Sequence, residues 1–226
     1  MKKSIKIPLI AAAVFFSVLI TVQKNGMLRK YSCNSTANEP GLKYEAPMLV
    51  SNVPEYHNGD FITFNYNDKM FGYHTRVYRL VGSPGDVLEL KKGVLYINGK
   101  NTDAALNLKH IYILSHALTK QLINQKFIKP TDAMITDGGA YKVFLDDDFA
   151  ALNKLTDKRY VMEKNISDKY ILTTYRKYWN VDNFGPLTLP ENKYFVLGDN
   201  RHNAEDSRYI GLIDKQDITG KVLIQL

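Results

Sequence analysis

The chain has 226 residues, a formal net charge of +7 and a composition that is 45% hydrophobic. This length can bury the core of one large domain, or of one domain that carries an insertion. The single cysteine, Cys33, excludes an intramolecular disulfide, and it is interpreted as an isolated thiol in a linker. The basic residues are dispersed along the chain, which argues against nucleic acid as a partner.

An apolar segment near the N-terminus, Ile7–Val22, follows three lysines and contains no charged residue. It is shorter than the roughly 20 residues of a typical transmembrane helix, so a cleaved secretory signal is the alternative to a membrane anchor. No A-x-A cleavage site follows the segment, and we therefore predict an uncleaved anchor over residues 1–24. Basic residues just after it suit lipid headgroups. Residues 25–47 are polar and rich in glycine and proline, which predicts a tether.

The remaining chain, residues 48–226, is predicted to fold as a mainly β domain. Alternating or β-branched segments with strand character are found at 61–66, 75–81, 87–90, 94–97, 194–197 and 222–226. Lys91-Lys92-Gly93 joins two of these segments as a hairpin. Between about 101 and 183 the sequence changes to longer mixed segments, with possible helices at about 111–125 and 146–155. We interpret this part as an inserted α+β cap.

The most specific pattern of the chain lies at residues 198–211, which read G-D-N-R-H-N-A-E-D-S-R-Y-I-G. It follows the apolar run at 194–197 and predicts a strand that leads into a loop of buried ion pairs. The charged residues of this loop are Asp199, Arg201, Asp206 and Arg208. Two further motifs precede it: S-N-V-P at Ser51–Pro54 with G-D at residues 59–60, and Y-R-L-V-G-S-P-G-D at Tyr78–Asp86.

These three motifs, in this order, resemble those of type I signal peptidases, the membrane-anchored serine endopeptidases that remove signal peptides from exported proteins. In that family the nucleophilic serine lies in an S-M-x-P motif, and a general-base lysine begins the motif K-R-x-x-G-x-P-G-D. The resemblance assigns Ser51 as the candidate nucleophile and places Tyr78 where the lysine stands, followed by Arg79. It gives Asp199, Arg201, Asp206, Arg208 and Arg79 the task of supporting the site.

The resemblance implies a fold of coiled antiparallel sheets with a smaller cap. It implies that the partner is a preprotein signal peptide of Ala-x-Ala type, bound as an added strand, and that membrane lipid lies nearby. No cofactor and no metal are expected. The implied location is the bacterial inner (cytoplasmic) membrane, with the catalytic domain on the outer or periplasmic side. A dedicated substrate such as a pilin is one form of this activity.

Two groups of the family's catalytic machinery are missing. Tyr78 replaces the base, and a tyrosine with a normal pKa near 10 is protonated at neutral pH. Ala204 stands where the family has the serine that orients the lysine. A serine that aims an amine has no task once the amine is lost, so the two changes together indicate loss of the serine–lysine pair. A catalytically inactive relative that binds or presents a preprotein is therefore the competing hypothesis.

Other arrangements stay open. Lys69 and His74 lie upstream of Tyr78, and only a bulge or a shift of register would bring either toward Ser51. Leu49 cannot supply the side-chain hydroxyl that some members use to stabilise the oxyanion. A soluble self-cleaving regulator with a serine–lysine core is a third possibility, and the apolar N-terminal segment argues against it.

Overall fold

A computed structural model describes residues 10–13, 16–17, 20, 25, 27–68 and 70–226. Within this part of the chain, no helix is both long enough and apolar enough to cross a bilayer. Most of the predicted anchor, residues 1–24, lies outside the described residues.

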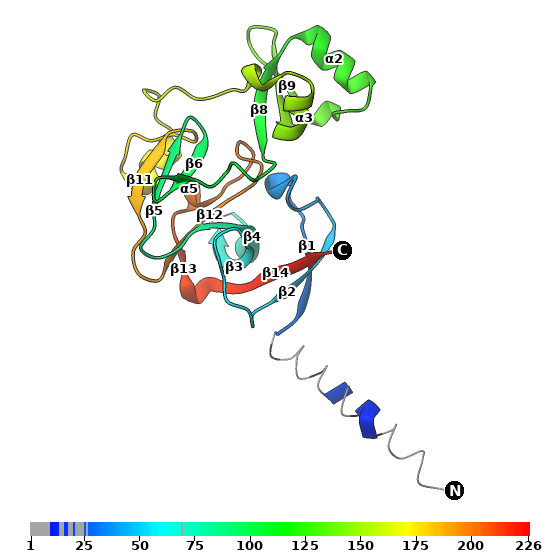
Figure 1. Cartoon of the computed structure of the whole chain (residues 1–226), viewed down its shortest axis with the longest axis vertical. Helices are drawn as coiled ribbons and strands as arrows, with labels where there is room; N and C mark the ends of the chain where they lie inside the picture. Colours follow the sequence, from blue (N-terminus) through cyan, green and yellow to red (C-terminus); the bar gives the residue numbers. More distant parts are fainter. Residues whose placement is uncertain (1–9, 14–15, 18–19, 21–24, 26, 69) are drawn as a thin grey trace, which may run out of the picture.

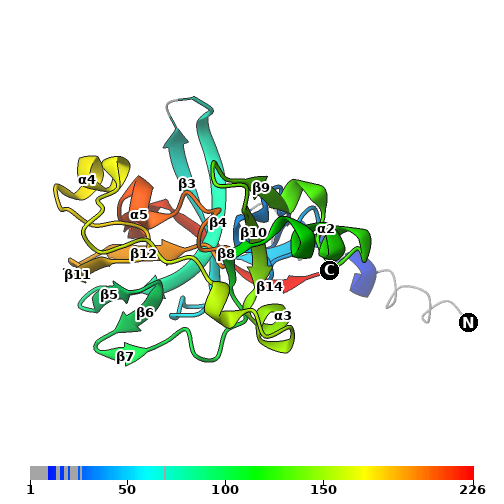
Figure 2. The ribbon, with the colours of Figure 1, turned by 90° about the horizontal axis from the view of Figure 1, so that it is seen from above.

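The largest element of the fold is a seven-stranded antiparallel sheet with the order β1-β2-β14-β3-β4-β12-β13 (Figure 1). Its strands are β1 (Arg29–Ser32), β2 (Pro47–Ser51), β3 (Phe61–Asp68), β4 (Gly72–Gly82), β12 (Lys193–Leu197), β13 (Ile213–Asp214) and β14 (Ile218–Gln225). Strands β3 and β4 pair along their whole length, from Phe61 with Arg79 to Asp68 with Gly72. Together they form a long hairpin that stands out from the body of the molecule (Figure 2).

Two smaller antiparallel sheets complete the β structure. The four-stranded sheet has the order β11-β5-β6-β7 and contains β5 (Val87–Lys91), β6 (Val94–Ile97), β7 (Lys100–Asn101) and β11 (Phe184–Thr188). The three-stranded sheet has the order β8-β10-β9 and contains β8 (Lys109–Leu114), β9 (Ala133–Ile135) and β10 (Tyr141–Asp146). The three-stranded sheet lies with two helices at one end of the molecule (Figure 1).

The described helices are short. The α-helices are α2 (His116–Asn124), α3 (Asp147–Leu152), α4 (Lys169–Tyr175) and α5 (Ser207–Ile210), and the 3₁₀ helices are η1 (Thr36–Asn38), η2 (Pro130–Asp132), η3 (Thr156–Lys158) and η4 (Lys215–Asp217). Side chains cap the α-helix starts; for example, the Ser115 hydroxyl accepts from the Leu118 amide and the Asp146 carboxylate from the Phe149 amide. The region predicted as an insertion has its own apolar cluster, centred on Tyr112, Val143 and Leu145.

The prediction of a mainly β, antiparallel domain is confirmed, and each of the six segments with strand character lies in a strand. The helix predicted at 111–125 is wrong in its first part. His110, Tyr112 and Leu114 alternate into the core as strand β8, and the helix begins only after Ser115. Among the aromatic residues of the inserted region, Tyr175 and Trp179 pack on the main core, whereas Tyr178 is exposed.

The predicted tether, residues 25–47, is largely part of the folded domain. Strand β1 pairs with β2, and Cys33 and Leu42 are buried in a cluster with Met48 and Val50. Burial raises the pKa of the Cys33 thiol. The segment is polar in composition because only a few of its residues pack in the core. Its other residues are fixed by backbone hydrogen bonds, such as that from the Leu42 amide to the Asn38 carbonyl, which composition does not reveal.

We expect Leu42→Ala to lower the free energy of unfolding by about 2–5 kcal/mol, because the substitution leaves a cavity in a closed core. Urea denaturation of the purified chain measures the change. Leu223→Ala is the matched control because Leu223 is 49% exposed, against 3% for Leu42. Equal and small effects of the two substitutions would show that residues 33–42 are not packed as described.

Candidate functional site

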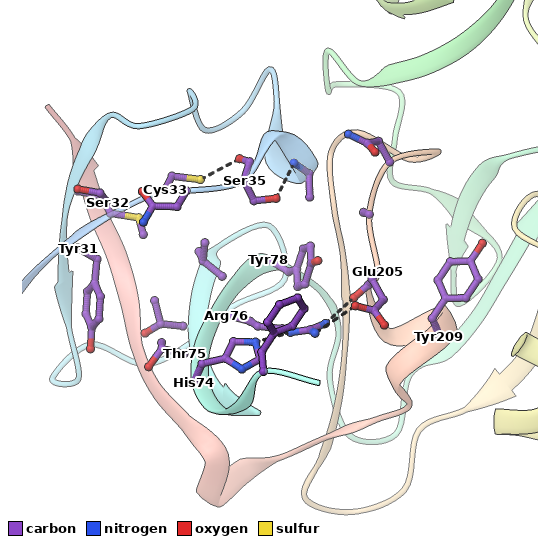
Figure 3. Close-up of a pocket in the computed structure, with 18 of the residues that line it drawn as sticks. Tyr31, Ser32, Cys33, Ser35, His74, Thr75, Arg76, Tyr78, Glu205 and Tyr209 are labelled. Carbon is purple, nitrogen blue, oxygen red and sulfur yellow. Dashed lines mark hydrogen bonds and ion pairs between the residues drawn. The ribbon is translucent and has the colours of Figure 1, made fainter. Parts of the chain in front are cut away.

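An open cleft of about 950 Å³ lies between β4 and the segment that follows β1. His74, Arg76 and Tyr78 line it from alternate positions of β4, and Cys33 and Ser35 line it from across the cleft (Figure 3). The loop around Ala204 and Glu205, together with α4, contributes the rest of the wall. The cleft is therefore long enough to follow one strand of the main sheet.

Tyr78 lies at the inner part of this cleft and is nearly buried. Its ring packs against Phe64, with the ring centroids 6.2 Å apart. Burial raises the pKa of Tyr78 well above its usual value, and the nearby Asp206 carboxylate raises it further. Arg76, two residues earlier on the same strand, also lines the cleft and lowers the pKa of Tyr78, but its effect is outweighed. Tyr78 is thus protonated at neutral pH and unsuited to accept a proton.

Two alanines pack beside Tyr78 in the same buried cluster, Ala37 and Ala204. Ala37 belongs to η1, whose start is capped by the Ser35 hydroxyl, and its carbonyl accepts from the Asn200 amide at 3.0 Å. Gly198 lies against both alanines. A Cβ added at Gly198 would be 2.4 Å from the Ala204 Cβ and 2.5 Å from the Ala37 carbonyl oxygen, so a side chain there would clash with both. The side chains that these two positions contribute to the cluster of Tyr78 are therefore methyl groups, without a hydroxyl or an amine.

Ser51, the predicted nucleophile, is not brought to Tyr78. The pairing runs from Ser51 to Lys221, from Lys221 to Ile62 and from Ile62 to Tyr78, so two strands lie between them. At about 4.8 Å for each step, the two residues are on the order of 14 Å apart across the sheet. The Ser51 hydroxyl donates to the Met27 carbonyl at 2.6 Å and does not line the cleft.

Of the two alternative bases, the structure describes only His74, and His74 does not reach Ser51. His74 pairs with Tyr66 on the hairpin, and its Nε2 accepts a hydrogen bond from Arg76 Nε at 3.1 Å. Lys69 lies outside the described residues. The strand pairing of the hairpin has no bulge between Phe61 and Asp68, so no shift of register moves His74 toward the serine.

The charged residues of the 198–208 loop form the network that the sequence predicts. Arg208 is fully buried and makes a two-point ion pair with Asp206, at 2.8 and 2.7 Å. Asp206 also accepts from the Gly198 amide at 3.0 Å. Arg79 makes a second two-point pair with Asp199, and Arg201 makes a third with Asp103 at 2.6 Å. Each of the four loop residues and Arg79 is thus engaged in a side-chain ion pair.

We expect Asp206→Ala to lower the free energy of unfolding by about 3–5 kcal/mol, because it leaves the Arg208 charge buried without its partner. Chemical denaturation measures the loss. Asp214→Ala is the control: Asp214 pairs with Lys193 at the surface, where removal of an ion pair costs less than about 1 kcal/mol. A small effect at both positions would contradict the supporting role of the loop.

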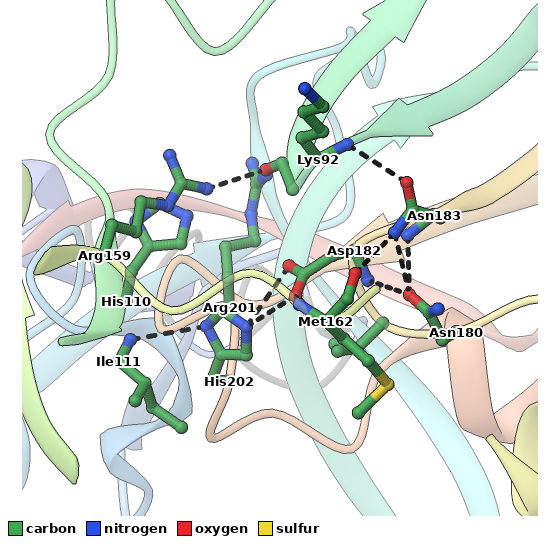
Figure 4. Close-up of polar contacts among 12 residues, drawn as sticks. Lys92, His110, Ile111, Arg159, Met162, Asn180, Asp182, Asn183, Arg201 and His202 are labelled. Carbon is green, nitrogen blue, oxygen red and sulfur yellow. Dashed lines mark hydrogen bonds and ion pairs between the residues drawn. The ribbon is translucent and has the colours of Figure 1, made fainter. Parts of the chain in front are cut away.

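A second polar network joins the inserted region to this loop (Figure 4). The His110 ring on β8 bonds to Asp147 at 2.9 Å, and the His202 ring bonds to Asp182 at 3.2 Å. The two rings meet edge to face with centroids 5.8 Å apart. Burial lowers the pKa of His110 to about 4, and the nearby Arg159 adds to this effect against the pull of Asp147. His110 is therefore neutral in the folded protein at neutral pH.

The lowered pKa of His110 makes stability depend on pH. Between about pH 6.5 and pH 4 the unfolded chain binds a proton on this histidine that the folded chain does not, so stability falls as the pH falls through this range. From pH 7 to pH 5 the loss due to His110 should be about 2 kcal/mol. Denaturation of His110→Asn at both pH values should show a smaller loss by that amount, whereas the exposed His57→Asn should match the wild type.

The chain was compared with known proteins. The family model of signal peptidase, peptidase S26, matches residues 3–226. Signal peptidase I S of Bacillus subtilis (strain 168) is 28% identical over 214 residues, which cover 92% of this chain and 82% of that protein. Signal peptidase IB of Staphylococcus aureus (strain COL) is 29% identical over 232 residues, with 98% and 89% covered. The structure of signal peptidase I from Enterococcus faecalis V583 matches with 24% identity and a TM-score of 0.37, over 76% of this chain and 100% of that chain.

The described residues thus form a β-rich domain of antiparallel sheets, with an ion-paired loop and an open cleft beside β4. The family match extends over nearly the whole chain, and the chain belongs to the signal peptidase family, peptidase S26. Members of this family are serine endopeptidases that act on the signal peptides of preproteins.

Sequence reasoning missed Ala37 as a residue of the site. The segment Ala37-Asn38-Glu39-Pro40 carries a proline three residues after its first position, as Ser51-Asn52-Val53-Pro54 does. A search that required a serine selects Ser51, although proline spacing alone fits both segments. The structure brings Ala37, and not Ser51, to Tyr78 and Ala204.

Proposed function

We propose that this chain is a signal-peptidase-like protein that binds an extended segment of a preprotein in the cleft and does not cleave it. The observation that carries the proposal is the buried cluster of Ala37, Tyr78 and Ala204. In this reading Ala37 stands at the position of the family's nucleophilic serine, Tyr78 at that of its base and Ala204 at that of the orienting hydroxyl. The nucleophilic hydroxyl, the lysine amine that acts as base and the hydroxyl that orients this amine are then all absent.

Amide hydrolysis by this route needs a hydroxyl, a neutral base within hydrogen-bond reach and a group that orients the base. A methyl group cannot attack a carbonyl. A phenol whose pKa is raised by burial holds its proton, so Tyr78 cannot take one from a hydroxyl or a water near pH 7. The site therefore supports recognition of a peptide better than its hydrolysis.

Other nucleophilic groups of the cleft are engaged elsewhere. Cys33 Sγ donates to the Ser35 carbonyl at 3.4 Å, and the Ser35 hydroxyl accepts from the Ala37 amide at 3.1 Å. Among the described residues, no hydroxyl or thiol that lines the cleft is hydrogen-bonded to a lysine amine or a histidine ring. A substitute pair of nucleophile and base is thus not formed there.

The peptide would bind as an added strand. Strand β12 pairs with β4 only from Arg79 to Gly82, and no described strand pairs with that edge over residues 72–78. The Val77 carbonyl accepts from the Asn38 side-chain amide at 2.8 Å, and residues 74–78 of β4 line the cleft. An extended preprotein segment with small side chains, of Ala-x-Ala type, fits this mode.

In this proposal residues 1–24 anchor the chain in the bacterial cytoplasmic membrane, and the domain lies on its outer or periplasmic side, next to exported preproteins. A dedicated client such as a pilin is the narrower form of the proposal. The second candidate function is signal-peptide cleavage with Ser51 as nucleophile. Membership of a family of serine endopeptidases favours it.

The test is cleavage and binding of a preprotein with an Ala-x-Ala site by the purified full chain in detergent. We expect the wild type to bind the preprotein and to leave it intact. The triple variant Ala37→Ser/Tyr78→Lys/Ala204→Ser should gain cleavage, and omission of Tyr78→Lys should reduce the rate by about 10²-fold or more, the usual share of a positioned base.

Ser51→Ala, made in the wild type and in the triple variant, is the decisive control. It should leave binding, and cleavage by the triple variant, unchanged. Cleavage by the wild type that disappears in Ser51→Ala would overturn the proposal in favour of the second candidate. Retained preprotein binding by each variant, measured by fluorescence anisotropy, shows that it is folded.

A further inference from the structure

The loop around α4 carries a group of exposed basic and aromatic side chains. Among the exposed residues of the segment 163–178, four are cations and only Glu163 is a carboxylate. Tyr170 and Tyr178 of the same segment are 61% and 79% exposed. We call the following residues together the α4 patch: Lys164, Lys169, Tyr170, Arg176, Lys177 and Tyr178.

Hydrogen bonds hold the loop that presents this patch. The side-chain amide of Asn180, which is fully buried, donates to the Glu163 carbonyl at 2.8 Å. The Asp168 carboxylate caps the start of α4, and the Asp168 amide donates to the Trp179 carbonyl at 2.9 Å. The two ends of the loop are therefore joined, and the backbone of the α4 patch is ordered before any partner binds.

The charges of the patch are not used within the fold. Among the described residues, none of its four cations takes part in an ion pair, whereas Lys193 and Lys221 are paired with carboxylates. The Lys169 Nζ lies 4.8 Å from the centroid of the Tyr170 ring. Arg176 ends α4 in the left-handed conformation, with φ of 57°, where glycine is the usual residue. Neither ion pairing nor backbone preference accounts for these cations.

The patch continues one wall of the cleft. Tyr170 itself lines the cleft, together with Thr173 and Thr174 of α4. The Thr174 hydroxyl donates to the Tyr209 carbonyl at 2.8 Å, which ties α4 to α5 (Figure 2). A peptide that lies in the cleft and extends past Tyr170 would therefore reach Lys169 and the rest of the patch.

The composition of the patch suits an acidic peptide. Tyrosine and arginine are enriched where proteins bind other proteins, and unpaired cations attract carboxylates. Continuity with a cleft that fits an extended peptide favours a peptide over anionic lipid as the occupant. We propose that the α4 patch binds an acidic segment of the client, next in sequence to the small-residue segment that occupies the cleft. This inference rests on the proposed function and adds the charge of the client to it.

The test compares fluorescein-labelled peptides by fluorescence anisotropy with the purified full chain in detergent. All contain an Ala-x-Ala segment, and each pair has a run of aspartates in one peptide and an equal run of asparagines in the other. The run precedes the segment in one pair and follows it in a second pair, so that one pair directs it toward α4. In that pair we expect the acidic peptide to bind about tenfold more tightly at low salt, and added NaCl to reduce this advantage.

The double variant Arg176→Gln/Lys177→Gln should reduce the advantage to about threefold or less and leave the affinity for the neutral peptide unchanged. Lys120→Gln/Lys126→Gln is the matched control, because it removes the same charge from exposed positions that do not line the cleft. It should keep the full advantage. Equal binding of acidic and neutral peptides, or equal losses in the two double variants, would refute the inference and leave the proposed function intact. If none of the peptides binds, the proposed function fails and the inference fails with it.

Anionic lipid is the alternative occupant, and phosphatidylglycerol mixed into the detergent is the probe for it. An advantage of the acidic peptide that persists in this mixture supports the peptide as occupant. If the lipid abolishes the advantage in the wild type, the α4 patch is assigned to lipid and the inference is wrong.

Discussion

The buried ion pair of Asp206 and Arg208 fixes the loop on which the rest of the site depends. Arg208 is buried, its charge is balanced by Asp206, and it donates two further hydrogen bonds, to the carbonyls of Val181 and Arg201. Asp206 in turn holds the Gly198 amide at the other end of the loop. Because a buried charge tolerates few arrangements, the path of the chain between these residues is closely determined.

This loop is hydrogen-bonded both to a residue that lines the cleft and to the start of the inserted region. The Asn200 amide holds the carbonyl of Ala37, which sets η1 against β4. On its other side, the Lys109 amide donates to the Asp199 carbonyl and the Arg201 amide donates to the Lys109 carbonyl, so the start of β8 is tied to the loop. The histidine pairs of His110 and His202 add to this connection. A substitution that moves the loop should therefore shift residues of the cleft and of the cap together.

Much of the architecture could be predicted from sequence because strands such as Phe61–Asp68 alternate with period two and are bounded by turn residues. The loop was predicted because its charges occur at fixed spacing. The location of the site was harder. Ser51 has the residue type of a nucleophile and the correct proline spacing, and only the order of strands in the sheet shows that two strands separate it from Tyr78. The sequence also did not reveal that residues 33–42 are part of the folded domain, because backbone hydrogen bonds, which leave no sequence pattern, fix much of this segment.

Under the proposed function, alanines at positions 37 and 204 have a kinetic consequence for a peptide in the cleft. An enzyme empties its site by converting the substrate, so one copy serves many molecules. A site without a nucleophile empties only by dissociation, and its occupancy follows affinity and client concentration. Such a protein acts in proportion to its copy number: it delays or delivers its client for as long as the complex lasts and returns it unchanged.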